Sequence, residues 1–216
     1  MKPIFRFEAL FNRRELRILS RLDSPARVQA FLADLTYSAD DFYRCPRRVL
    51  KDREAHCFDG ALFGAAALRR LGYPPLVLEM HAKHDDCHLI ALFRQHGCWG
   101  AVAKSNFAGL RFREPVYRTL RELVMSYFES FYNVEREKTL RSYTRPLNLG
   151  AFDKLDWMRS DEHLEKIGRR LDEVRAIPLV TPQMVAGLSR VDTRSYKAGL
   201  LGVNRAGLWR PPRESK

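Results

Sequence analysis

The stretch EAHCFDGALFGAAALRRLGY, residues 54–73, places a cysteine where a helix is expected to begin. Cys57 follows a histidine and precedes an acidic residue, and the rest of the helix is mainly small and apolar. A thiol in the first turn of a helix lies near the positive end of the helix dipole and near unpaired backbone N–H groups, and both favour the thiolate. Cys57 is therefore a candidate nucleophile, and the N–H groups at the head of its helix are expected to hold an oxyanion.

A nucleophilic cysteine needs a base, and the candidate is His88. It opens the apolar stretch HLIALF, so it can lie at the rim of a sheet and face the start of the cysteine's helix. The next stretch is expected to return alongside His88 near Ser105 and Asn106, where no carboxylate is present. The amide of Asn106 or the hydroxyl of Ser105 is therefore the candidate to orient the imidazole, as in the Cys-His-Asn variant of the catalytic triad.

Local signals predict the elements that position these residues. A helix is expected over residues 58–71, because its apolar residues share one face and Gly72 followed by two prolines ends it. Its alanines and glycines allow a sheet to pack closely against it. Strands are expected at residues 75–80, 87–95 and 98–105, the last two forming a hairpin that turns at His96 and Gly97.

Further helices are expected on both sides of this core. One covers residues 13–22, and the next begins at Ser24 and Pro25, a pair typical of a helix start. The apolar stripe from Val116 to Phe131 predicts a helix within residues 114–133, and residues 161–175 predict another. The segment 38–56 is polar and is expected to be turn-rich, with Pro46 interrupting it.

The order of these parts resembles the transglutaminase-like superfamily, with its papain-like core. The resemblance covers roughly residues 45–110 and rests on the cysteine motif, the histidine that opens the second strand and the residues that open the third: Cys57, Asp59, Ala61, Ala67, Leu68, Arg69, Gly72, His88, Gly97 and Trp99. It implies an α+β fold in which the cysteine-bearing helix packs on a small antiparallel sheet, with Cys57 as nucleophile and His88 as base. The family usually has an aspartate four residues after the tryptophan, and Ala103 stands there instead.

We therefore expect a single domain over residues 1–216, with a transglutaminase-like core at about 45–133, a helical N-terminal lead and a C-terminal extension at 134–216. The expected function is thiol-dependent acyl chemistry on a peptide, amide or thioester, completed by water or an amine, without a cofactor. One alternative is a catalytically inactive binding module of the same fold with a basic surface. Another is a metal-binding protein that uses the His81–His88 cluster, although that cluster lacks the second half of a typical zinc site.

Composition limits the partners and the compartment. The formal net charge is +12 over 216 residues, but basic and acidic residues alternate as on solvated helix faces, which argues against nucleic acid as the main partner. An acidic substrate is a hypothesis suggested by that charge. No apolar run approaches the roughly 20 residues that span a bilayer, so we expect no membrane partner and a cytoplasmic protein. The four irregularly spaced cysteines are expected to be free thiols.

Overall fold

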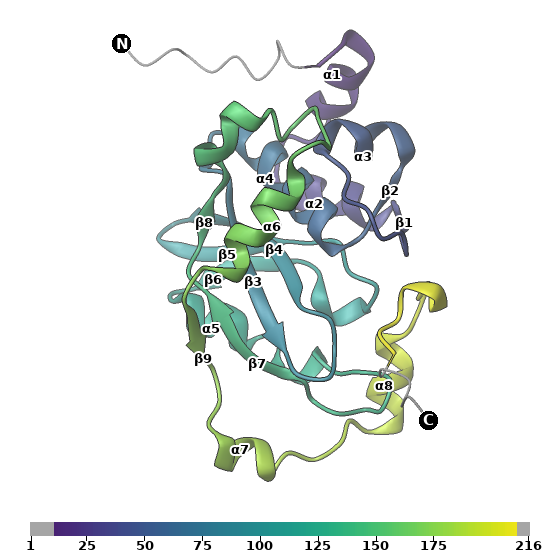
Figure 1. The fold of residues 1–216 in the computed structure, drawn as a ribbon, viewed down its shortest axis with the longest axis vertical. Helices are drawn as coiled ribbons and strands as arrows, with labels where there is room; N and C mark the ends of the chain where they lie inside the picture. Colours follow the sequence, from purple (N-terminus) through teal and green to yellow (C-terminus); the bar gives the residue numbers. More distant parts are fainter. Residues whose placement is uncertain (1–10, 211–216) are drawn as a thin grey trace.

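A seven-stranded antiparallel sheet lies at the centre of the fold (Figure 1). The structure is a computed structural model that describes residues 11–210. The strand order is β6-β5-β4-β3-β7-β9, and β8 also pairs with β3. The strands are β3 (Leu76–Ala82), β4 (His88–Gln95), β5 (Cys98–Val102), β6 (Arg113–Tyr117), β7 (Leu140–Thr144), β8 (Leu147–Asn148) and β9 (Ala176–Pro178).

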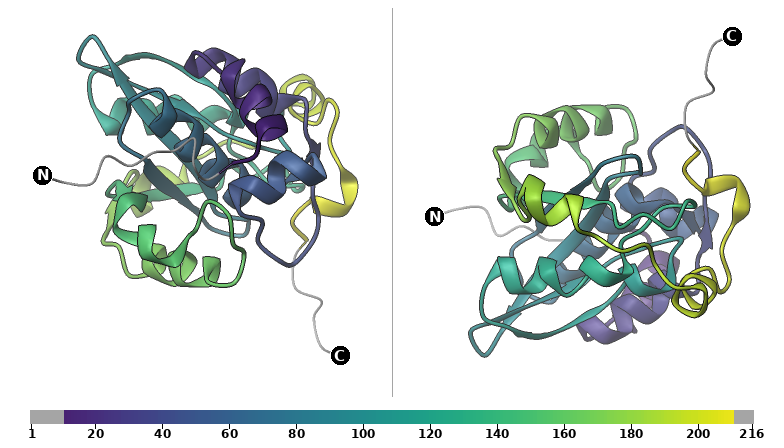
Figure 2. Two further views of the ribbon diagram at one scale, coloured as in Figure 1. Left: turned by 90° about the horizontal axis from the view of Figure 1, so that it is seen from above. Right: turned by 90° about the horizontal axis from the view of Figure 1, so that it is seen from below.

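Helices pack on both faces of this sheet, so the chain is a mixed α+β protein, as expected. The helices are α1 (Arg13–Ser20), α2 (Pro25–Ala33), α3 (Pro46–Asp52), α4 (Cys57–Arg70), α5 (Leu120–Met125), α6 (Leu164–Asp172), α7 (Pro182–Ala186) and α8 (Thr193–Gly199). Two short strands, β1 (Thr36–Tyr37) and β2 (Glu54–Ala55), pair in parallel just before α4. Figure 2 shows the C-terminal segment, in yellow, beside the N-terminal part of the chain in both views.

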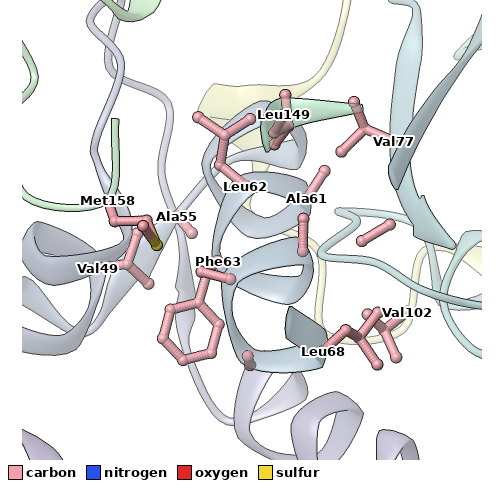
Figure 3. Close-up of a cluster of buried hydrophobic side chains, with 14 of the residues drawn as sticks. Val49, Ala55, Ala61, Leu62, Phe63, Leu68, Val77, Val102, Leu149 and Met158 are labelled. Carbon is pink, nitrogen blue, oxygen red and sulfur yellow. The ribbon is translucent and has the colours of Figure 1, made fainter. Parts of the chain in front are cut away.

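Alternate residues of the central strands divide the core in two. Val77, Leu89 and Ala91 face α4 and join the first cluster of buried side chains, whereas Leu78 and Ile90 belong to the second cluster on the opposite face. Figure 3 shows part of the first cluster, with Ala61, Leu62, Phe63 and Leu68 of α4 among Val77, Val102 and their neighbours. The period of two in each strand thus places α4 on one face of the sheet.

The close packing of α4 on the sheet depends on its small residues, as the sequence suggested. A Cβ at Gly64 would lie 2.8 Å from Val102 Cγ2 and 3.1 Å from Ala91 Cβ, and a Cβ at Gly60 would collide with Lys104. Any larger side chain at these positions would push the helix away from the strands. The glycines therefore set the distance between the head of α4 and the strands below it.

Several local predictions are confirmed. Ser24 caps α2, because its hydroxyl accepts from the Arg27 N–H at 3.3 Å, and the four cysteines are all free thiols. The β4–β5 hairpin turns at His96 and Gly97, whose φ angles of 49° and 79° are those that a two-residue hairpin turn requires. Within residues 11–210, no helix combines the length and the apolar character needed to cross a membrane.

Two local predictions are wrong. Residues 114–133 do not form one helix: β6 pairs with the edge of β5, α5 covers only Leu120–Met125, and Val116 is 65% exposed. Backbone pairing at an open sheet edge outweighs helix propensity here, and Pro115 is tolerated because an edge strand need not donate from every residue. Pro46 does not interrupt the chain but starts α3, since a proline at the first helical position lacks only an N–H that has no helical partner.

Candidate functional site

Cys57 is the first residue of α4, and the histidine before it caps the helix. His56 Nδ1 accepts from the backbone N–H groups of Phe58 and Asp59 at 3.2 and 3.4 Å. Accepting at Nδ1 requires a neutral ring, and burial lowers the pKa of His56 to about 4. These bonds occupy two of the N–H groups at the head of α4 that we expected to hold an oxyanion, those of Phe58 and Asp59; the N–H of Cys57 is not among the groups that His56 binds.

A buried ion pair fixes the head of α4. The Asp59 carboxylate is fully buried, and its Oδ1 accepts from the Arg44 backbone N–H at 2.7 Å, while the Arg44 Nη1 lies 3.8 Å from Oδ2. Arg44 also pairs with Asp40, and with Glu54 at 3.4 Å. Burial raises the pKa of Asp59 to about 7. The aspartate of the Cys-x-Asp motif thus has a structural role at the start of α4, in addition to its part in the family resemblance.

The Cys57 thiol is half-buried, and its sulfur has a hydrogen-bond contact. Its Sγ donates to the carbonyl oxygen of Cys87 at 3.8 Å. Burial raises the pKa of the thiol to about 12, and the nearby carboxylates of Asp86 and Asp59 add to the rise, whereas the Leu89 N–H opposes it. Desolvation is therefore the largest influence on the pKa of this thiol in the arrangement that the structure shows.

His88 is the first residue of β4 and is almost completely buried. Its Nε2 lies 2.8 Å from the carbonyl oxygen of Leu110, and its ring meets that of Phe131 edge-on at 6.4 Å between centroids. Because a carbonyl can only accept, the proton must be on Nε2, which leaves Nδ1 unprotonated in the neutral ring. Burial lowers the pKa of His88 to about 4.

The structure brings Cys57 and His88 to one small cavity of about 40 Å³. They approach it from different faces of the sheet. The His88 ring contacts members of the second cluster, whereas α4 covers the face to which Leu89 belongs. Among the hydrogen bonds of residues 11–210, none joins Cys57 Sγ to the His88 ring; the two groups are neighbours across a cavity, not a bonded pair.

Asn106 and Ser105 also line that cavity, but neither bonds to His88. The Asn106 amide is bonded to the C-terminal segment: Nδ2 donates to the carbonyl oxygens of Asn204 and Gly207, and Oδ1 accepts from the Asn204 N–H. The Ser105 hydroxyl accepts from the backbone N–H of Phe107 at 3.0 Å. The group that orients His88 is the Leu110 carbonyl, which the sequence could not reveal because every residue carries one.

A larger groove of about 490 Å³ opens beside Cys57. Three carboxylates line it, together with aromatic side chains and the end of the described chain: Asp40, Glu79, Asp86, Tyr43, Phe58, Trp209 and Arg210. No described residue forms an ion pair with the Asp86 carboxylate, and burial raises its pKa. Asp40 is paired with Arg44 and Glu79 is in contact with His81, so Asp86 is the carboxylate of this groove that has no ion-pair partner among the described residues.

The histidine cluster at residues 81–88 is dispersed. His81 Nε2 lies 3.1 Å from Glu79, His84 Nδ1 lies 3.7 Å from Glu137, and His88 is bonded to Leu110. Within the described part of the chain, no three His, Cys, Asp or Glu side chains are grouped so that they could hold a metal ion. The metal-binding alternative therefore has no support from the geometry.

Comparison with known proteins gives a limited result. No family model matches the chain, and no curated protein matches it. Among solved structures, LapG from Legionella pneumophila is similar over 48% of this chain and 72% of that chain, with 15% identity and a TM-score of 0.35. An EGTA-treated form of Legionella pneumophila LapG is similar over 46% of this chain and 56% of that one, with 17% identity and a TM-score of 0.30. Likenesses of this size assign neither a family nor an activity.

Proposed function

We propose that this protein carries out thiol-dependent acyl chemistry, with Cys57 as nucleophile and His88 as base. One observation carries the proposal: both residues line a single cavity, and Leu110 holds His88 in the tautomer whose Nδ1 can accept a proton. The arrangement of Cys57 on a helix and His88 on a strand, which resembles the transglutaminase-like superfamily with its papain-like core, supports the same reading. The acyl donor in this proposal is an amide or thioester.

The chemistry can be written with its protons in balance. The Cys57 thiol gives its proton to His88 Nδ1, and the sulfur bonds to the substrate's carbonyl carbon. The tetrahedral intermediate collapses, the bond to the leaving group breaks, and the His88 imidazolium returns the proton to that leaving amine or thiol. Water or an amine then attacks the acyl-thioester and loses a proton to Nδ1; that proton returns to the sulfur as the product leaves.

This chemistry requires the sulfur to move. In the structure the thiol donates to the Cys87 carbonyl, so Sγ has to leave that contact before its proton can reach His88. The raised pKa of the thiol describes this resting arrangement. A thiol that pairs with imidazole and gains access to water is more acidic, because both changes stabilise the thiolate.

Acylation of Cys57 by a small aryl thioester tests the proposal. We expect mass spectrometry to find one acyl group on the Cys57 peptide, none in the Cys57→Ser variant, and about 100-fold slower acylation in His88→Gln, the loss typical of a missing general base. Cys87, an exposed thiol in the same chain, is the internal control for non-specific reaction. Equal rates in the wild type and His88→Gln, with both proteins folded by circular dichroism, would remove His88 from the mechanism.

The second candidate is a binding module without catalysis. It is favoured by the raised pKa of Cys57 and by the absence of a hydrogen bond between its sulfur and His88 within the described residues. In that case the groove beside Cys57 binds its partner and the thiol stays inert. The same experiment separates the two, because a binding module leaves Cys57 unacylated under conditions that modify Cys87.

A further inference from the structure

The last described residues, 204–210, form a segment that we call the C-terminal strap. Asn106 holds it at both ends of a short turn: Nδ2 donates to the carbonyl oxygens of Asn204 at 2.8 Å and Gly207 at 3.0 Å, and Oδ1 accepts from the Asn204 N–H at 2.8 Å. The Asn204 side chain in turn donates to the backbone oxygen of Tyr37 at 2.8 Å. Tyr37 and Asn106 line the small cavity together with Cys57 and His88, so these bonds attach the strap beside that cavity.

Gly207 brings the strap into close contact with Tyr37. A Cβ at Gly207 would lie 2.8 Å from Tyr37 Cε1, so a larger residue here cannot keep the same position. Gly207 and Trp209 line both the small cavity and the larger groove, and Cys57 lines both as well. The strap therefore runs across the approach to the candidate nucleophile.

The chemistry of the strap matches that of the groove. The strap ends in Trp209 and Arg210, which line the same groove as the Asp86 carboxylate; the other two carboxylates of the groove, Asp40 and Glu79, are paired with Arg44 and His81. The Asp86 carboxylate has no ion-pair partner within residues 11–210, so a cation near it would be held by an unneutralised charge. Tyr43 and Phe58, whose rings stack at 4.2 Å, add an aromatic surface of the kind that attracts indole and guanidinium groups.

We propose that the C-terminal strap is an internal ligand of the Cys57 groove, and that the external ligand of this groove is an extended peptide with an aromatic residue next to a basic one. The inference rests on the proposed function, because it names the substrate class and the regulation of the same site. With the strap in place, the groove is occupied and Cys57 is shielded. When the strap leaves, a peptide of similar chemistry can bind, and the thiol becomes accessible.

Gly207→Val in the 216-residue chain tests this, because the added side chain collides with Tyr37 while the peptide backbone stays intact. Gly187→Ala is the matched control, since its Cβ would meet nothing closer than 3.8 Å. The probe is the synthetic peptide VNRAGLWR, which has the sequence of residues 203–210. We expect Gly207→Val to bind this peptide roughly tenfold more tightly than the wild type or Gly187→Ala do, because the internal competitor has been removed.

Two further measurements complete the test. Hydrogen exchange of the amides at 204–210 should be faster in Gly207→Val, and a peptide with Glu in place of its final Arg should bind more weakly than VNRAGLWR. Asn106→Ala, which removes three strap bonds, is the second variant if Gly207→Val does not fold. Unchanged exchange together with unchanged peptide affinity overturns the proposal, as does tighter binding of the charge-reversed peptide.

The outcomes also separate this inference from the proposed function. If the strap is released and the peptide binds, but Cys57 is not acylated in any variant, the internal ligand stands and the acyl chemistry fails. If Cys57 is acylated at the same rate in the wild type, Gly207→Val and Gly187→Ala, the chemistry stands and the shielding strap fails.

Discussion

A backbone carbonyl, not a side chain, fixes the proton of His88. Because Nε2 donates to Leu110, the neutral ring has its proton on Nε2 and none on Nδ1, and burial disfavours the charged form. We predict that His88 keeps the Nε2–H tautomer and titrates with a pKa of about 4. Nitrogen-15 spectra of the imidazole as a function of pH measure both properties. A ring that titrates near 6.5, or one that has its proton on Nδ1, would contradict the geometry described for this residue.

The lowered pKa of His88 makes the free energy of unfolding depend on pH. His88 takes up a proton near pH 6.5 in the unfolded chain but only near pH 4 in the folded protein. The contribution of the neutral ring to the free energy of unfolding is therefore complete above pH 6.5 and is lost as the pH falls through 4. The free energy of unfolding should therefore fall from pH 7 to pH 4.5 by about 2 to 3 kcal/mol more in the wild type than in His88→Gln. Asp59 and Asp85, whose raised pKa values act in the opposite direction, are the same in both proteins.

At the residue scale, the sequence identifies positions better than it identifies orientations. Cys57 could be placed at the head of a helix because capping residues and periodicity are local signals. The face to which His88 belongs could not be predicted, because HLIALF is apolar on both faces and a strand alternates every residue. The use of Asn106 as an anchor for residue 204 depends on a contact 98 residues away, for which one sequence carries no signal.

The distance between α4 and the sheet depends on the absence of a side chain at Gly64. Gly64→Ala improves the intrinsic helix propensity but places a Cβ 2.8 Å from Val102 Cγ2 in a packed core. We predict a net loss of about 1 to 2 kcal/mol in the free energy of unfolding, measured by urea denaturation. Gly168→Ala in α6 is the matched control: its nearest neighbour would lie at 3.6 Å, so the same change should be neutral or stabilising. Equal effects at both positions would mean that α4 can shift at little cost.

Helices and turns that begin at a capping or turn residue were predicted well, whereas a strand that forms by pairing with a neighbouring strand was not. Ser24 before Pro25 and the turn at His96 and Gly97 act through local backbone geometry, which a short stretch of sequence specifies. The strand β6 exists because β5 offers a free edge, and that edge is a property of the assembled sheet. Residues 114–133 carry apolar residues at helical spacing, so periodicity alone favoured the wrong element.

For the whole molecule, net charge is a poor guide to the charge of the candidate site. The chain carries +12, and that excess suggested an acidic substrate. The groove beside Cys57 instead holds the Asp86 carboxylate, which has no ion-pair partner among residues 11–210, so this part of the groove favours a cation. Charges that alternate along the sequence can separate in space once helices and strands fold, and only the fold determines which sign faces the groove.

The two buried clusters share one sheet, and this makes the single-domain expectation testable. Neighbouring residues of β3, Val77 and Leu78, point into opposite clusters, so neither cluster can lose its packing while the strands stay in register. We predict one cooperative unfolding transition in urea, with coincident curves from the fluorescence of Trp157 in the first cluster, after Trp99 and Trp209 are replaced by Phe, and from far-ultraviolet circular dichroism. Leu68→Ala in the first cluster and Leu92→Ala in the second should each lower the free energy of unfolding by about 2 to 5 kcal/mol. Both variants should move the two curves together. If Leu92→Ala shifted the circular dichroism curve and left the Trp157 curve in place, the two faces of the sheet would be separate folding units.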